Sequence, residues 1–135
     1  MPSPRGYRNN NPGNIRLSKS LWLGKVNLEQ NTDGAFEQFI SMEYGLRAMM
    51  KLIIKYITKY GDEDIVGIVS RYAPAKENDI EAYVDSVVEK SGFGPYDELK
   101  PDKETIITLV KAMCIHENGK DQIPQETFEK AWDLI

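Results

Sequence analysis

The chain has 135 residues, a length typical of one domain whose hydrophobic core is large enough to fold without disulfides or metals. Its 17 lysines and arginines are outnumbered by 21 aspartates and glutamates, and the resulting net charge of −4 argues against a non-specific nucleic-acid binder. The single cysteine excludes an internal disulfide, and one cysteine with one histidine is too few for a structural zinc site. We expect no cofactor.

Residues 1–20 are rich in proline, glycine and asparagine and predict loops and turns. The segment has no apolar stretch of the kind found in signal peptides, and no run in the chain approaches transmembrane length. We therefore expect a protein that is made in the cytoplasm without a signal peptide and is not inserted in a membrane. If it works elsewhere, another route must release it.

Two short apolar patches, Leu21–Val26 and Phe36–Ile40, flank a turn-like segment at 31–34 and predict a small β-hairpin. From residue 41 onward the apolar residues follow helical spacing. Helices are expected over residues 41–60, 63–71, 80–90, 102–118 and 125–134. The predicted fold is mainly α: a single domain over residues 1–135, with four or five helices around one core and a loop-rich segment at 1–20.

The predicted helix between Asp102 and Gly119 carries the most informative acid of the chain. Asn118 and Gly119 tolerate the left-handed conformation that ends helices, which places Glu117 in the last turn. The negative end of the helix dipole disfavours a carboxylate there, and burial would raise its pKa further. A general acid requires a protonated carboxyl group at neutral pH, whereas the simpler interpretation is a solvated glutamate at a helix end.

Five clusters of polar and aromatic residues stand out, and none contains a phosphate-binding, metalloprotease, nucleophile-elbow or calcium motif. They are RNNNPGNIR (8–16), WLG (22–24), FEQFISMEYGLR (36–47), RYAPAKENDIEAY (71–83) and HENG (116–119). Amides, aromatic rings and acids together suit a carbohydrate better than a nucleotide, because sugars need neutral hydrogen bonds and a flat apolar platform. Each cluster by itself is also explained as a turn or a helix cap.

These five motifs resemble those of a phage and prophage-borne group of muralytic, lysozyme-like proteins, whose members start with RNNNPGNIR and contain the other four motifs, HENG among them. The resemblance covers nearly the whole chain. It implies a lysozyme-like helical domain that cleaves the glycan strands of peptidoglycan. It also implies action at the cell wall, either after phage-type release or as part of a virion in contact with other virion proteins.

The chain also resembles, in segments, bacterial glucosaminidases of the lysozyme superfamily. Those enzymes place the helix with their catalytic glutamate before the segment that resembles residues 9–16, and here only seven residues precede Arg8. The ending AMCIHENG (112–119) resembles the end of their catalytic helix. We therefore interpret the chain as circularly permuted, with Glu117 as its general acid.

The resemblance then implies the remaining site residues. The proposed sugar contacts are Asn9, Asn11, Asn14, Ser41 and Tyr83, although Tyr83 has an equally good interpretation as a core residue. Candidates for a second carboxylate are Glu43, Glu77 and Asp79, each of which is also explained as a loop, first-turn or capping acid. Lytic transglycosylases need only one acid, so the lack of a clear partner favours that mechanism. The alternative function is a non-catalytic glycan-binding or virion structural protein of the same fold.

Overall fold

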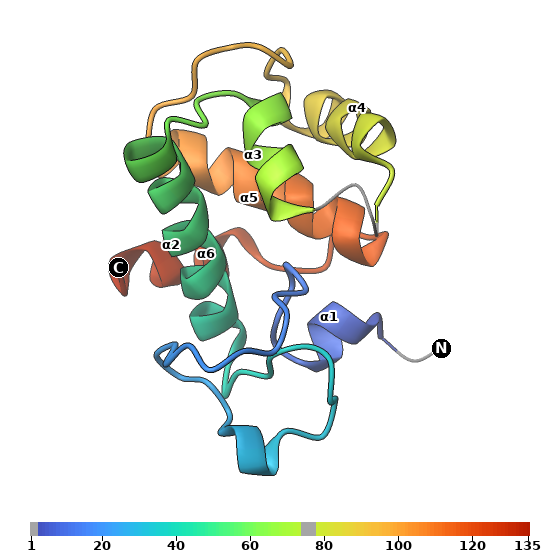
Figure 1. Cartoon of the computed structure of the whole chain (residues 1–135), viewed down its shortest axis with the longest axis vertical. Coiled ribbons are helices and arrows are strands. Elements are labelled where there is room, and N and C mark those ends of the chain that lie inside the picture. The colour runs from blue at the N-terminus through green and yellow to red at the C-terminus, as the bar shows by residue number, and fades with distance from the viewer. Residues whose placement is uncertain (1–2, 74–77) are drawn as a thin grey trace.

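The computed structural model describes residues 3–73 and 78–135 and is mainly helical, as predicted (Figure 1). The helices are α1 (Arg5–Arg8), α2 (Met42–Tyr60), α3 (Ile65–Tyr72), α4 (Ile80–Ser91), α5 (Lys103–Asn118) and α6 (Gln125–Asp133), with a 3-10 turn η1 (Leu28–Gln30). Within the described ranges, none of the helices has the length and apolarity needed to cross a bilayer.

The boundaries of α5 follow from its capping residues. The side chain of Asp102 accepts a hydrogen bond from the backbone N–H of Thr105 at 2.9 Å, which satisfies a donor that the first turn would otherwise leave unpaired. At the other end Gly119 adopts a left-handed conformation with φ of 76°, which costs glycine nothing and stops the helix. The predicted start and stop of this helix are confirmed, and Glu117 lies in its last turn.

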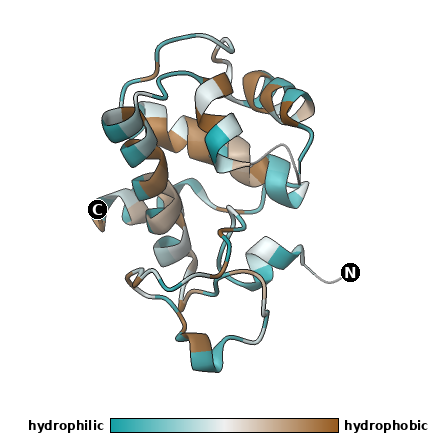
Figure 2. Cartoon of the chain, viewed as in Figure 1, coloured by the Kyte–Doolittle hydropathy of each residue, from teal (hydrophilic) through white to brown (hydrophobic). Residues whose placement is uncertain are grey.

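α2 and α5 form the centre of the hydrophobic core. Their fully buried side chains include Leu46, Met49, Met50, Ile53, Ile106, Leu109, Val110 and Met113. Burying each such side chain contributes about 1.5–3 kcal/mol. α4 packs on α5 and α6 packs on α2, and Figure 2 shows the strongest hydrophobic colouring on α2 to α5. The helical core thus holds the C-terminal end of α5 in a fixed position.

The predicted β-hairpin is not seen, and the described residues contain no β-strand. Phe36 instead forms an isolated antiparallel bridge with Arg16, and Phe39 forms another with Lys25. The segment 35–40 thus pairs with residues 15–17 over its first half and with residues 24–26 over its second half. Each pairing is too short for a ladder, and Gly24 interrupts the first predicted segment with a left-handed φ of 78°, so the hairpin prediction was wrong.

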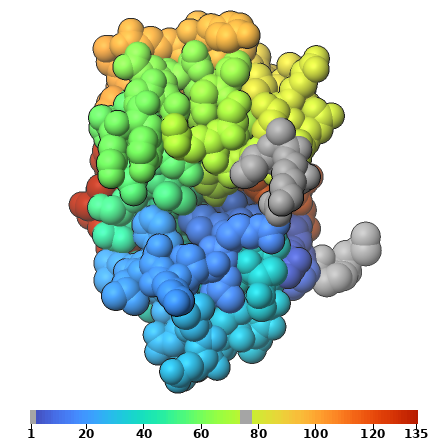
Figure 3. Space-filling model, viewed as in Figure 1, coloured from blue at the N-terminus to red at the C-terminus, as the bar shows by residue number. Residues whose placement is uncertain are grey.

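Residues 9–41, which we call the loop lobe, form the lower part of the molecule beneath α2 (Figure 1). Figure 3 shows this blue and cyan lobe as one end of the molecule, in contact with the green helices above it. The lobe is held from within by a buried ion pair, in which the ammonium of Lys25 lies 3.0 Å from Glu37 Oε2. A cleft lies where this lobe meets the C-terminal ends of α3 and α5.

Candidate functional site

Glu117 is bound by two side chains that come from distant parts of the chain. The amide Nδ2 of Asn14, in the loop lobe, donates to Glu117 Oε1 at 2.9 Å. The hydroxyl of Tyr83, on α4, donates to Glu117 Oε2 at 2.8 Å. The expected proximity of Glu117 to the asparagine-rich loop and to Tyr83 is therefore confirmed, across 103 and 34 positions of sequence.

Burial raises the pKa of Glu117, because removal from water penalises the charged carboxylate. The hydrogen bonds from Asn14 and Tyr83 act in the opposite direction, since both donors favour the ionised form. Burial and the nearby Glu117 charge raise the pKa of Tyr83 well above its ordinary value, so its hydroxyl stays protonated and available as a donor. Burial is the larger of these effects, so the pKa of Glu117 lies above its ordinary value.

Glu117 opens into a cleft of about 210 Å³ between the loop lobe and the helices. Its lining residues are Gly13, Asn14, Arg16, Phe36, Tyr72, Ala73, Asn78 and Glu117. Among these described residues Glu117 is the one acid, and the others offer amides, aromatic rings and a guanidinium group. Such a lining can hydrogen-bond a neutral polar ligand while one acid faces it.

The loop that carries Asn14 is clamped from two helices. The hydroxyl of Tyr72 donates to the carbonyl of Gly13 at 2.6 Å, and Asn118 Nδ2 donates to the carbonyl of Pro12 at 2.7 Å. Asn14 itself has a φ of 51°, a left-handed conformation that asparagine tolerates better than most residues but that still costs on the order of 1 kcal/mol. The clamp holds this conformation and so directs the Asn14 amide at Glu117.

Two of the predicted sugar contacts are structural instead. Asn11 is completely buried, and its amide donates to the carbonyls of Ile15 and Glu37, both at 3.0 Å. Asn9 is also buried, and its Nδ2 donates to Asp33 Oδ2 at 2.9 Å. Because these amides serve the loop's own backbone and side chains, we assign both residues to the scaffold of the cleft.

The other predicted residues lie away from Glu117 or outside the described chain. Ser41 is the residue before the first turn of α2, and neither Ser41 nor Glu43 lines the cleft. Asp79 accepts a hydrogen bond from the Ala82 N–H at 3.0 Å and so caps α4. Glu77 lies outside the described residues. Of the described acids, then, none joins Glu117 in the cleft as a second carboxylate.

Four cleft residues were missed as site candidates, namely Arg16, Phe36, Tyr72 and Asn78. All four lie inside the motifs at 8–16, 36–47 and 71–83. Their membership of these motifs was the signal in the sequence that could have identified them as site residues. Arg5 and Arg16 both stack on the Phe36 ring, at 4.6 and 4.9 Å from its centroid, which makes this ring a fixed wall of the cleft. Within 3–73 and 78–135, no cluster of three or more histidines, cysteines or acids is arranged to hold a metal ion.

The raised pKa of Glu117 predicts a pH-dependent cost in folding stability. A carboxyl group whose pKa is higher in the folded than in the unfolded state favours the fold while it is protonated. This stabilisation is fully present below the unfolded pKa and is lost as pH rises through the folded pKa. Glu117→Gln should therefore raise Tm by about 2–6 °C at pH 7–8, and the gain should vanish below about pH 4, under the unfolded pKa of glutamate. Thermal scans across pH test this, with Glu104→Gln on the exposed first turn of α5 as a control without such a gain.

The comparisons with known proteins give one clear relative. The chain is 36% identical over 132 residues to Protein P5 of Pseudoalteromonas phage PM2, an alignment that covers 96% of this chain and 80% of the relative. The chain belongs to the family of this phage protein. No family model matches the chain. Membership in the Protein P5 family agrees with the phage origin that the sequence motifs imply.

Proposed function

We propose that this protein cleaves glycosidic bonds of peptidoglycan in a lysozyme-like fold, with Glu117 as the general acid. The observation that carries the proposal is a carboxyl group whose pKa is raised by burial. It is held by Asn14 and Tyr83 and faces a cleft lined by amides, aromatic rings and one guanidinium group. Membership in a phage protein family and the resemblance of five motifs to muralytic proteins support the same assignment.

The chemistry follows from a single acid. Glu117 gives its proton to the glycosidic oxygen as the bond between that oxygen and the sugar carbon breaks, and an oxocarbenium-like transition state forms. A hydroxyl of the same sugar then attacks this carbon, and the Glu117 carboxylate takes up the proton that the hydroxyl loses. Because no other described acid lines the cleft, we favour this intramolecular route of lytic transglycosylases over hydrolysis.

The position of Glu117 supports the proposed circular permutation. Its helix follows the asparagine-rich loop in sequence by about 90 residues, yet Asn14 of that loop binds its carboxylate. The acid needs to lie next to the loop in space but not in sequence. The helix that carries it can therefore come before or after the asparagine-rich loop along the chain.

Mass spectrometry of digested peptidoglycan tests the proposed reaction. Purified walls incubated with the protein should release soluble muropeptides that end in an anhydro sugar, one water lighter than hydrolysed products. Release of hydrolysed muropeptides instead would support the proposed cleavage of glycosidic bonds but reject the transglycosylase mechanism. An intact wall after prolonged incubation would reject both.

A second candidate function is that of a virion protein that binds glycan without cleaving it. The phage relative and the lack of a second acid among the described lining residues favour it. This function predicts that the protein sediments with purified walls, that Asn14→Ala weakens the sedimentation, and that no muropeptide is released.

A further inference from the structure

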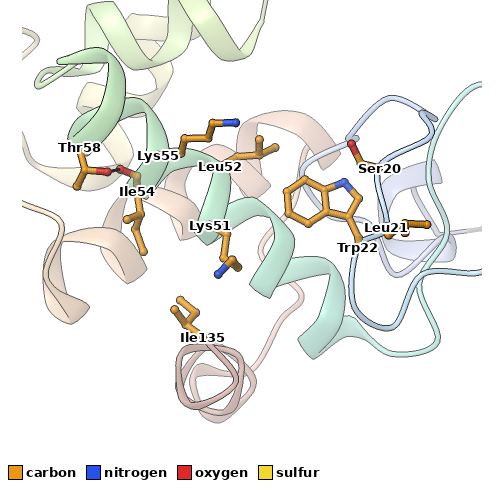
Figure 4. A pocket seen from close by; sticks show the side chains of 9 residues that line it. All are labelled: Ser20, Leu21, Trp22, Lys51, Leu52, Ile54, Lys55, Thr58 and Ile135. Atoms are coloured by element: carbon orange, nitrogen blue, oxygen red, sulfur yellow. Dashed lines mark hydrogen bonds between the residues drawn. The ribbon is translucent and has the colours of Figure 1, made fainter.

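A larger groove lies along the outer face of α2, apart from the cleft, with a volume of about 580 Å³. It is lined by Ser20, Leu21, Trp22, Lys51, Leu52, Ile54, Lys55, Thr58 and Ile135. Figure 4 shows Trp22 reaching it from the loop lobe, the two lysines from α2 and Ile135 from the end of the chain. The lining combines apolar surface with two lysines, none of its side chains is acidic, and we call it the α2 groove.

The lysines of the α2 groove belong to a basic stripe on α2, in which Arg47, Lys51, Lys55 and Lys59 recur every four residues. Side chains four apart are neighbours on a helix, and each such pair of like charges is destabilising by about 0.2–0.5 kcal/mol. The only acid of α2 is Glu43. Among the described residues no carboxylate forms an ion pair with Lys51 or Lys55, although the chain has an excess of acids.

Lys51 and Lys55 lie about one helical turn apart, and four residues of α-helix rise about 6 Å. A flexible peptide that lies along α2 can therefore place one carboxylate against each lysine, while Trp22, Leu52 and Ile54 contact its apolar groups.

The loop lobe contributes residues to both the cleft and the α2 groove. Arg16 and Asn14 line the cleft, and Ser20 and Trp22, only a few residues later in the sequence, line the α2 groove. A polymer that carries both a glycan and a flexible peptide branch offers one ligand for each surface.

We propose that the α2 groove binds the stem peptide of peptidoglycan, a short peptide with several free carboxylates and apolar alanine methyl groups. This inference rests on the proposed function, since peptidoglycan is the polymer assigned to the cleft. The stem peptide would let the protein distinguish peptide-bearing glycan from bare glycan.

Direct binding to the peptide tests the proposal without any cleavage. Isothermal titration of Glu117→Gln with L-Ala-γ-D-Glu-meso-diaminopimelate-D-Ala should give a Kd below 1 mM. Lys51→Glu/Lys55→Glu in the same background should weaken binding at least tenfold. The control Lys100→Glu/Lys130→Glu makes the same change in net charge at exposed positions outside the α2 groove and should bind as before.

The outcomes separate this proposal from that for the cleft. Peptide binding that depends on Lys51 and Lys55 supports the inference even if walls are never cleaved. Absence of binding, equal loss in the control variant, or tighter binding of an oligothymidylate of similar length overturns it. Cleavage of walls by a wild type that does not bind the peptide would leave the proposed function standing and reject this inference alone.

Discussion

Replacing Glu117 with glutamine should abolish release of muropeptides from purified walls, with a loss of at least about 100-fold in rate. General acid catalysis typically contributes 10²–10⁴-fold, and glutamine has no proton to give to the glycosidic oxygen. Glutamine keeps the length of the side chain and can still accept the hydrogen bond that Asn14 donates. The loss should therefore come from the missing proton and not from a collapsed cleft.

Glu104→Gln is the matched control, since it makes the same chemical change in the first turn of the same helix, where the side chain is exposed. Its rate of release should equal that of wild type. If Glu117→Gln retains more than a tenth of the wild-type rate while remaining folded, Glu117 is not the general acid.

Replacing Gly45 with alanine should destabilise the fold by about 1–3 kcal/mol or more, although alanine is the better helix former by about 1 kcal/mol. A Cβ on Gly45 would lie 1.8 Å from the carbonyl oxygen of Asn10 and 3.1 Å from Pro12 Cδ, so the asparagine-rich loop packs directly on the backbone of α2. The clash pushes away the loop that carries Asn14. Thermal unfolding should show Tm lower by roughly 4–10 °C, with activity reduced as well.

Gly67→Ala in α3 is the comparison for this effect. There the nearest atom to a new Cβ is 3.3 Å away, on the Asp64 side chain, so the change should alter Tm by only a few degrees. A Gly45 variant as stable as the Gly67 variant would show that the loop does not need this close contact with α2.

The helices from α2 onward could be predicted because their signals are local. Apolar residues at helical spacing and caps such as Asp102 and Gly119 act within one or two turns, and the structure confirms them. The short helix α1 was missed within the predicted loops of residues 1–20, because its four residues have no side-chain cap and no helical apolar pattern. The β-hairpin prediction failed because pairing is not local. Residues 35–40 change partner halfway, and the competing segment at 15–17 has no strand-like apolar pattern.

The candidate site could be predicted only because whole motifs of the chain resemble those of muralytic proteins. Position alone left Glu117 as an ordinary helix-end acid, and the motifs placed it beside Asn14 and Tyr83, where the structure has it. The same reasoning misassigned Asn9 and Asn11, because an amide that binds other groups of its own loop looks no different in sequence from one that binds a ligand. Only the folded chain distinguishes the two.

The hydrogen bond between Asn14 and Glu117 joins residues 103 positions apart, which has a consequence for biosynthesis. A ribosome adds about 5–20 residues per second, so Glu117 is made roughly 5–20 s after Asn14. During that interval the nascent chain holds a loop with no acid to bind. The cleft is therefore among the last parts to assemble, and a translation product that stops before α5 carries none of the proposed chemistry.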